Sequence, residues 1–270
     1  MKPRDITMPR VSIITTLYNY KHFLPELAES VANQTFKDWE WVIVDDASTD
    51  SPEDVLDVLR GHSKIKIITH DENRGYSVAK NTAIKASTGE YLVMIDADDV
   101  LTPNSLTDRV KVLDENPDKL WVHADALNYE MDGTIATTYI KWNEVNRRKQ
   151  SEKHDLTEWY HHRLVHSQTV MVRREFHEIL GLYDETLRFS SDNEMFRRAI
   201  IFGYIPYYLE VPVAIYRVHR DRMSRSKFKK QNLSITKEYI VRIVDQRFNE
   251  GIKPSNTLLL DKREVVCVYE

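Results

Sequence analysis

Residues 91–103 read YLVMIDADDVLTP, and in this stretch an apolar run ends abruptly in three aspartates. The run 91–95 has the composition of a short buried strand. Asp96, Asp98 and Asp99 follow within four positions, and carboxylates this close raise each other's pKa unless a cation neutralises them. Oxygen ligands without cysteine favour Mg²⁺ or Mn²⁺. The alternative is that Asp98 or Asp99 caps the helix that follows.

The chain around this stretch alternates strand and helix patterns four times. Strand-like runs at 11–19, 39–45, 65–70 and 91–95 are each followed by a helix-like segment, at 22–34, 51–62, 76–87 and 103–116. In the second helix Ser51 is the expected N-cap and Gly61 lies past the end, and Gly89 is expected to close the third. This alternation predicts a parallel sheet wrapped by helices.

The alternation of strand and helix patterns ends after residue 124. Asp132-Gly133 stands between two β-rich runs and predicts a hairpin. The region 141–163 has no clear period and is interpreted as an irregular excursion. The later predictions are a strand near 167–174, helices near 174–180 and 192–203, broken strands over 204–219, a long amphipathic helix from Phe228, and a last short strand. The residues expected in the core are Trp39, Trp41, Trp121, Met195, Ala199 and Phe202.

Composition excludes several classes of protein. The net charge of −4 over 270 residues does not suggest wholesale binding to nucleic acid or anionic lipid. The single cysteine, Cys267, cannot form an intramolecular disulfide or a cysteine-built metal site. No apolar run reaches the roughly 20 residues that span a bilayer, and MKPRDITMPR lacks the apolar core of a signal peptide. We therefore expect a soluble intracellular protein.

Polar residues follow each of the first four predicted strands. They are Thr16, Tyr18 and Asn19; Asp45 and Asp46; Asn73, Arg74 and Gly75; and Asp96, Asp98 and Asp99. Ligands of parallel α/β sheets lie outside the carboxyl ends of the strands. We therefore expect all four sets to converge on one edge.

The types of residue at that edge fit a nucleotide. Asp45 or Asp46 offers a carboxylate to a nucleobase N–H, although the DDASTD turn is equally explained as a structural turn. Tyr18 is placed to stack on a base or to pack. Arg74 and Gly75 precede a helix N-terminus, which favours an anion such as a diphosphate. The sequence contains neither G-x-G-x-x-G nor G-x-x-x-x-G-K-[ST], which counts against a dinucleotide or P-loop site.

Four segments together resemble family 2 glycosyltransferases, which are inverting, nucleotide-sugar-dependent enzymes of the GT-A fold. The segments are VSIITTLYNYKHFLPELAESVANQTFKDWEWVIVDDASTD, ENRGYSVAKNTAIKASTGEYLVMIDADD, LGLYDETLRFSSDNEMFRRAIIFGY and YRVHRDRMSRS. The resemblance implies a GT-A, Rossmann-like mixed sheet, mainly parallel in its N-terminal half and flanked by helices, with a C-terminal helical extension. The implied domain is 1–226, with a nucleotide-binding half at about 10–125, an acceptor half at about 126–226, and a helix and short strand in 227–270.

The resemblance also implies roles for individual residues. Asp96-Ala97-Asp98 matches the Asp-x-Asp motif of the family. The implied metal ligands for Mn²⁺ or Mg²⁺ are Asp98, Asp99 and His219. The implied substrate- and nucleotide-binding residues are Thr16, Tyr18, Asp45, Asp46, Arg74, Gly75, Lys80, Asp96 and Arg217, with uracil as the base read most often.

The catalytic base implied by the resemblance is Asp192. The family often has Glu-Asp here, whereas this chain has Ser191-Asp192, and Glu194 could serve as the base if the register is shifted. Lys80 stands where an arginine is frequent, and the basic segment around His219 suits a loop that closes on a diphosphate.

The function implied is transfer of a hexosyl or pentosyl group from a nucleoside-diphosphate sugar, most often a UDP-sugar, to a hydroxyl of a glycan or other acceptor. Surface-polysaccharide or glycoconjugate synthesis is the default. Alternatives are a non-carbohydrate acceptor such as modified DNA, a catalytically silent nucleotide-sugar-binding module, a nucleotidyltransferase, and a purely structural α/β protein. The expected location is the cytoplasm, with peripheral contact at the inner face of the membrane left open.

Overall fold

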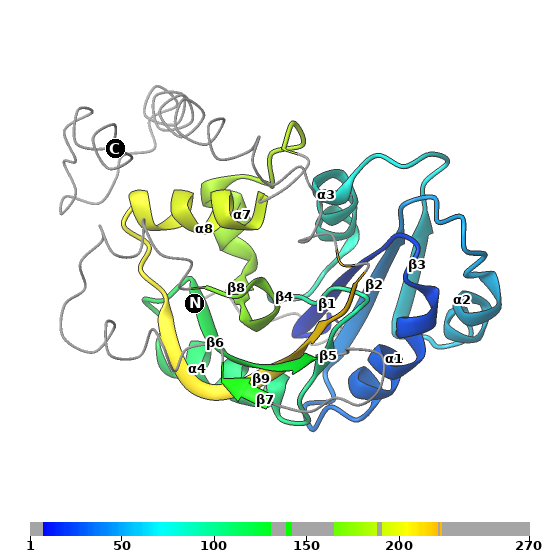
Figure 1. The fold of residues 1–270 in the computed structure, drawn as a ribbon. Helices are drawn as coiled ribbons and strands as arrows, with labels where there is room; N and C mark the ends of the chain where they lie inside the picture. The colour runs from blue at the N-terminus through cyan, green and yellow to red at the C-terminus, as the bar shows by residue number, and fades with distance from the viewer. Residues whose placement is uncertain (1–7, 131–138, 142–164, 188–190, 221, 223–270) are drawn as a thin grey trace.

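The architecture is a single mixed sheet with helices on both faces (Figure 1). The computed structural model describes residues 8–130, 139–141, 165–187, 191–220 and 222. Within them, the strand order is β3-β2-β1-β4-β8-β6-β9-β5, with β7 paired to β6. The first four strands in this order are β3 (Ile65–Thr69), β2 (Trp39–Asp45), β1 (Val11–Leu17) and β4 (Tyr91–Met94). These four strands run parallel to one another, which confirms the mainly parallel N-terminal half.

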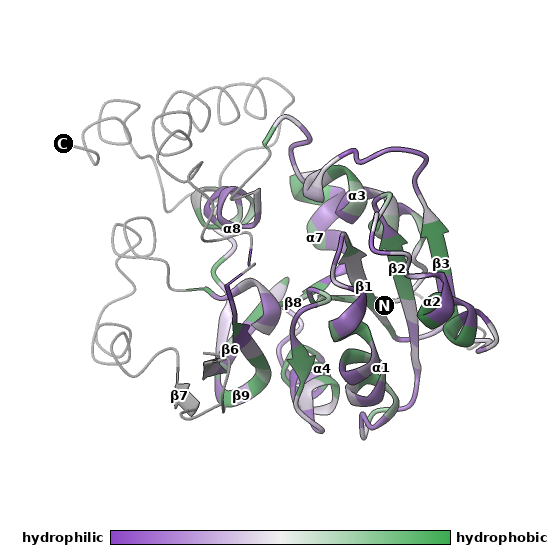
Figure 2. Cartoon of the chain, turned by 45° about the vertical axis from the view of Figure 1, so that its right-hand side comes forward, coloured by the Kyte–Doolittle hydropathy of each residue, from purple (hydrophilic) through white to green (hydrophobic). Residues whose placement is uncertain are grey.

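Two separate apolar clusters cover the two faces of this sheet. The β-branched and aromatic residues of the strands alternate, so that Trp41 and Ile43 join one cluster while Val42 and Val44 join the other. The first cluster packs against α1 (Leu24–Ala32), α2 (Glu53–Arg60) and α4 (Ser105–Glu115). The second packs against α3 (Tyr76–Ala86), α7 (Arg174–Leu180) and α8 (Ser191–Ile201). Figure 2 shows the apolar colouring of β2 and β3 between these layers.

The second half of the sheet is where the parallel order breaks. Strand β8 (Met171–Arg173) is antiparallel to both β4 and β6 (Trp121–Glu130), whereas β9 (Tyr207–Val218) is parallel to β6. Strand β7 (Tyr139–Lys141) is antiparallel to β6, which confirms the hairpin, although its Asp132-Gly133 turn lies outside the described residues. The excursion 142–163, the helix from Phe228 and the last strand also lie outside them.

Most predicted elements and core residues are confirmed. Trp41, Trp121, Met195, Ala199 and Phe202 are all at most 2% exposed, and Trp39 is 6% exposed. The region 204–219 was expected to hold broken strands, and instead holds one long strand, β9. A register shift opposite Asp125 absorbs Pro212 without ending the strand. The two-residue strand β5 (Val100–Leu101) and the 3-10 turns η1 (Lys21–Phe23) and η2 (Ser167–Thr169) were not predicted.

Two predictions about helix ends are wrong. Ser51 is not the N-cap of α2, because Pro52 occupies that position and no side chain caps the helix. Gly89 does not close α3, which ends at Ala86 with Ser87 as its C-cap. Gly89 is needed for close packing instead, since a Cβ there would lie 2.6 Å from the amide nitrogen of Ser12.

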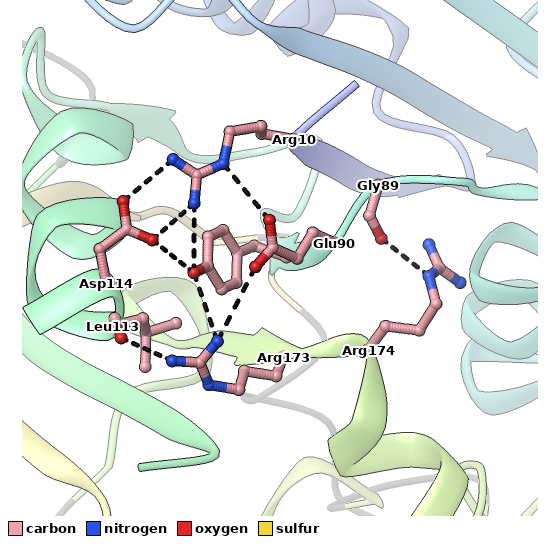
Figure 3. Close-up of polar contacts among 8 residues, drawn as sticks. Arg10, Gly89, Glu90, Leu113, Asp114, Arg173 and Arg174 are labelled. Atoms are coloured by element: carbon pink, nitrogen blue, oxygen red, sulfur yellow. Dashed lines mark hydrogen bonds and ion pairs between the residues drawn. The ribbon is translucent and has the colours of Figure 1, made fainter. Parts of the chain in front are cut away.

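A charged cluster ties α4 and the last residue of β8 to the amino ends of β1 and β4 (Figure 3). Arg10 donates to Asp114 of α4 over 2.9 Å, and the hydroxyl of Tyr91 donates to the same carboxylate over 2.6 Å. The guanidinium groups of Arg10 and Arg173 both lie over the ring of Tyr91, 5.2 and 5.4 Å from its centre. Burial raises the pKa of Asp114, but the bonds from Arg10 and Tyr91 outweigh it and leave the pKa below its usual value.

We expect Asp114→Asn to lower the free energy of unfolding at pH 7 by about 1 kcal/mol, since the carboxylate is partly exposed and screened. A depressed carboxyl pKa stabilises the fold above the unfolded-state pKa, and this contribution is lost as the pH falls through the folded-state value. The difference between wild type and variant should therefore shrink between pH 7 and pH 3.5 in urea unfolding. Asp57→Asn, in an exposed pair with Arg60 on α2, should change stability by less. A constant difference across this pH range would show that charge is not the cause.

Among the described residues, no helix combines the length and apolar character required to cross a bilayer.

Candidate active site

The carboxylate of Asp46 links the ends of β2, β3 and the loop before α3. Its Oδ1 accepts from the backbone N–H of Arg74 at 2.9 Å, and its Oδ2 accepts from that of Gly75 at 2.8 Å. His70, at the end of β3, lies 2.7 Å from Oδ1 through Nδ1. Asp46 is 3% exposed. The residue therefore fixes the start of α3 and retains acceptor capacity only on the Oδ2 side.

The loops after β1 and β2 are bound to each other beside Asp46. The Asn19 side chain accepts from the backbone N–H of Thr49 at 2.7 Å, and Ser48 accepts from the backbone N–H of Asn19 at 3.1 Å. Asp45 is buried and accepts from the backbone N–H of Ser48 at 3.1 Å. The structural-turn interpretation of DDASTD is therefore correct for Asp45. A contact between Asp45 and a ligand remains a prediction.

Tyr18, Asn73 and Arg74 are exposed at this edge. Tyr18 is 44% exposed, and the side chain of Arg74 is also exposed at the start of α3. Thr16, half-buried, is paired with Val44 in the β1–β2 ladder. The positions of these residues are compatible with binding a base and a diphosphate. Their contacts with a nucleotide remain predictions.

Asp96 is held by donors from two other elements. The hydroxyl of Tyr76, in the first turn of α3, donates to its Oδ1 at 2.7 Å, and Nε2 of Gln168, in η2, donates to its Oδ2 at 2.5 Å. Burial raises the pKa of Asp96, the charge of Lys80 lowers it, and the carboxylate of Asp98 raises it further. Both oxygens of Asp96 are thus oriented by the protein.

Asp98 and Asp99 are oriented by the end of β9. Nε2 of His219 lies 3.0 Å from Oδ2 of Asp98, and the backbone N–H of Arg217 donates to Oδ1 of Asp99 at 2.8 Å. The alternative that either aspartate caps a helix is wrong, because Asn104 is the N-cap position of α4. The structure thus brings His219 from more than a hundred residues away onto the Asp-x-Asp motif.

The chemistry of this cluster fits a divalent cation. One ligand atom from each of Asp96, Asp98 and Asp99 lies within 4.8 Å of the others. Oδ2 of Asp99 is buried and has no hydrogen-bond partner among the described residues. Burial, with the neighbouring charges of Asp98 and Asp96, raises the pKa of Asp99 well above its usual value. A buried carboxylate oxygen without a donor is costly, and a cation beside it would remove that cost.

Arg217 is placed differently from its predicted role. Its guanidinium is buried, forms an ion pair with Glu26 of α1, and lies 4.6 Å from the centre of the Phe23 ring. Its Nε donates to the backbone carbonyl of Asp98. We infer that Arg217 positions the acidic loop, because its donors are engaged by the carboxylate of Glu26 and the carbonyl of Asp98.

Asp192 lies in the first turn of α8 and is half-buried. Its charge and that of Asp96 both act on the buried ammonium of Lys80 and on the hydroxyls of Tyr76 and Tyr183. Glu194, the alternative base, is 2% exposed and forms an ion pair with Arg198, which also donates to the carbonyl of Leu180. Glu194 therefore anchors α8, whereas Asp192, like Asp96, lies close enough to influence the charge of Lys80.

Sequence reasoning missed the residues that orient the aspartates. These are His70, Tyr76 and Gln168. His70 and Tyr76 lie within the stretches that follow β3, so their position at the edge was a usable signal. Gln168 has no such signal, because only the antiparallel return of the chain at η2 and β8 brings it to the site.

Gly75 has φ 93° and ψ 158°, a backbone conformation that residues other than glycine rarely adopt. Space is not the obstacle, since a Cβ there would meet nothing within 4 Å. We expect Gly75→Ala to lower the free energy of unfolding by about 1–3 kcal/mol through strain alone. Urea unfolding measures this. Gly61→Ala is the matched control, because Gly61 has a helical φ of −68° and ordinary space around its Cβ, and equal losses in the two variants would contradict the strain argument.

Comparison with known proteins identifies the class. The sequence profile described as "Glycosyl transferase family 2" matches residues 12–201. An uncharacterized glycosyltransferase of Methanocaldococcus jannaschii is 28% identical over 85% of this chain and 78% of its own length. TuaG of Bacillus subtilis, assigned provisionally to teichuronic acid biosynthesis, is 26% identical over 82% of this chain and 84% of its own length. An uncharacterized protein of Sinorhizobium fredii is 34% identical, but the match spans only 50% of this chain and 15% of that protein.

Solved structures of other proteins share the fold of this chain. S. aureus TarS 1–349 in complex with UDP-GlcNAc has a TM-score of 0.68 and 18% identity, covering 96% of this chain and 70% of that one. The mannosyltransferase PcManGT from Pyrobaculum calidifontis, in complex with GDP-Man and Mn²⁺, has a TM-score of 0.65 and 20% identity, covering 99% and 73%. Both are GT-A glycosyltransferases, which confirms the predicted fold class. This chain belongs to glycosyl transferase family 2 and is a glycosyltransferase.

Proposed function

We propose that the enzyme is metal-dependent and inverting, and that it moves a sugar from a UDP-sugar to an acceptor hydroxyl during synthesis of a surface polysaccharide or glycoconjugate. The observation that carries this proposal is the cluster of Asp96, Asp98 and Asp99, whose ligand atoms lie within 4.8 Å of one another, with His219 bound to Asp98 at 3.0 Å. The influence of both Asp96 and Asp192 on the buried ammonium of Lys80 supports a base near the donor-side carboxylates, as transfer between two substrates requires.

The donor would lie along the carboxyl ends of β1 and β2 and along the loop that precedes α3. The exposed ring of Tyr18 is available to stack on the base, and the Oδ2 side of Asp46 is the remaining acceptor for a base N–H. The diphosphate would approach the N-terminus of α3, where Arg74 is exposed and Gly75 has open space above its backbone.

The residues that would hold the divalent ion are Asp98, Asp99 and His219, with Asp96 directed to the donor by Tyr76 and Gln168. The mixed oxygen and nitrogen donor set suits Mn²⁺ better than Mg²⁺. When bound, the ion supplies positive charge that stabilises the departing nucleoside diphosphate.

Asp192 would act as general base. One of its carboxylate oxygens takes the proton of the acceptor hydroxyl as that oxygen bonds to the anomeric carbon of the donor sugar. The bond from the anomeric carbon to the diphosphate oxygen breaks on the opposite face, and the electron pair leaves with the nucleotide. A single base without a covalent sugar–enzyme intermediate gives inversion of configuration.

The choice of UDP and of a glycan acceptor is supported by relatives. TarS was crystallised with UDP-GlcNAc, and TuaG is assigned provisionally to a polysaccharide pathway. PcManGT instead carries GDP-Man, so guanine is the competing base. We retain 1–226 as the catalytic domain, with nucleotide-binding and acceptor halves meeting near residue 125, and a cytoplasmic location with peripheral membrane contact.

A thermal-shift screen tests the donor. We expect UDP and UDP-sugars to raise the melting temperature more with Mn²⁺ than with EDTA, and GDP, ADP and CDP to raise it less. Release of UDP from the best UDP-sugar, with water as acceptor, then tests turnover. Stabilisation by no nucleotide would contradict the proposal, and stabilisation without any turnover would favour a silent binding module.

A further inference from the structure

The ammonium of Lys80 is enclosed by the protein at the centre of the site. Lys80 lies on α3 and is 2% exposed. Its Nζ lies 4.0 Å from the centre of the Tyr76 ring and 4.8 Å from that of Tyr183. It has no hydrogen-bond partner among the residues that the structure describes. A ligand cannot reach this ammonium without a rearrangement, so Lys80 does not fit the direct nucleotide contact that the sequence predicted.

This arrangement costs stability. A buried ammonium without hydrogen bonds loses its hydration, and contacts with aromatic rings restore only part of that loss. Burial accordingly lowers the pKa of Lys80, while the charges of Asp96 and Asp192 act in the opposite direction. A methionine of similar length would pack between the same two rings at lower cost. The fold alone therefore gives no reason for a lysine here.

The reaction does give a reason. The candidate base has to approach a donor whose diphosphate and neighbouring aspartates are all negative, and like charges repel at this range. A fixed positive charge near both carboxylates offsets that repulsion, and the ammonium of Lys80 lies beside Tyr76, whose hydroxyl donates to Asp96. The ammonium is itself held in place by two rings and not by a flexible surface contact.

The rest of α3 holds the segment that leads to the base. Asn81 donates to the carbonyl of Tyr183 at 2.8 Å and accepts from the backbone N–H of Tyr183 at 3.0 Å. Ser77 donates to the carbonyl of Leu187 at 2.8 Å. One helix thus carries the donor-side turn at Gly75, the buried cation, and the two attachments of residues 183–187.

We propose that Lys80 is a positioning residue whose buried positive charge allows Asp192 to sit beside the donor-binding carboxylates. It acts through Asp96 and Asp192 and touches no reacting atom. The proposal rests on the function proposed above, since it takes Asp192 as the base and Asp96 as a donor-side group.

Lys80→Met separates this role from a structural one. We expect kcat for UDP release to fall at least tenfold, the KM for the UDP-sugar to stay within threefold, and the melting temperature to stay the same or rise. Lys80→Arg, which keeps the charge, should recover part of kcat. Lys85→Met is the control, because Lys85 is exposed on the same helix, and it should leave all three quantities unchanged.

Three results would overturn the proposal. They are a kcat for Lys80→Met within threefold of wild type, a loss confined to donor KM, and a lower melting temperature with unchanged kcat. If Lys80→Met does not fold, Lys80→Arg decides: a soluble variant with kcat reduced as far as in Asp192→Asn would also overturn it. Absence of UDP release by the wild type is a different result, since it contradicts the proposed function itself.

Discussion

Asp192→Asn should reduce UDP release at least about a hundredfold, the lower end of what a positioned general base contributes. Asparagine keeps the size of the side chain but cannot take a proton from a hydroxyl or a water. Asp192 is half-buried in the first turn of α8 and, like Asp96, influences the charge of the buried Lys80. We therefore expect the loss to lie in kcat.

Nucleotide binding gives the second measurement for this variant. The Kd of UDP in the presence of Mn²⁺, from calorimetry, should stay within about threefold of the wild-type value, because Asp192 is not one of the three aspartates whose ligand atoms cluster within 4.8 Å. Asp184→Asn is the matched control, since Asp184 lies in the same region and accepts from the backbone N–H of Thr186. Equal losses of binding and turnover in Asp192→Asn would mean that the base has been assigned to the wrong residue.

The parallel half of the fold was predictable because its signals are local. Each strand of this half is a short apolar run, and each following helix has apolar residues three or four positions apart. The convergence of the loops follows from the sheet geometry, and contacts such as Asn19 with Thr49 and Asp46 with Gly75 confirm it.

The second half was harder because its order depends on distant pairings. β8 lies between β4 and β6, and β9 pairs with β6 in parallel, although neither relation leaves a pattern in the local sequence. The same holds at the site. His219 was found through resemblance, whereas Gln168 was missed, because only the three-dimensional return of the chain places its amide on Asp96.

Arg217 and Lys80 show where a motif position and its chemistry differ. Both were predicted to contact the nucleotide because both are cationic and lie near matching motifs. Both are instead buried, with Arg217 paired to Glu26 and Lys80 between two tyrosine rings. Sequence can place a charge near a site, but burial decides whether a ligand can reach it.

Asp98→Ala should weaken binding of UDP at least about tenfold in Mn²⁺, the lower end of the loss seen when groups around a metal are removed. Asp98 lies 3.0 Å from Nε2 of His219 and close to the unpartnered Oδ2 of Asp99. Its removal would take away one ligand and the partner that orients another. Titration calorimetry with UDP in Mn²⁺ and in EDTA measures the two conditions separately.

The EDTA measurement decides between a metal role and a general structural role for Asp98. Without a cation, the carboxylate only repels a diphosphate, so its removal should leave the Kd of UDP unchanged or lower it slightly. Asp71→Ala is the control, since Asp71 is an exposed carboxylate in the loop before α3 and should show no Mn²⁺-dependent change. An equal loss of affinity in Mn²⁺ and in EDTA would instead indicate that Asp98 maintains the loop through His219, and the assignment of the acidic cluster as a metal site would then fail.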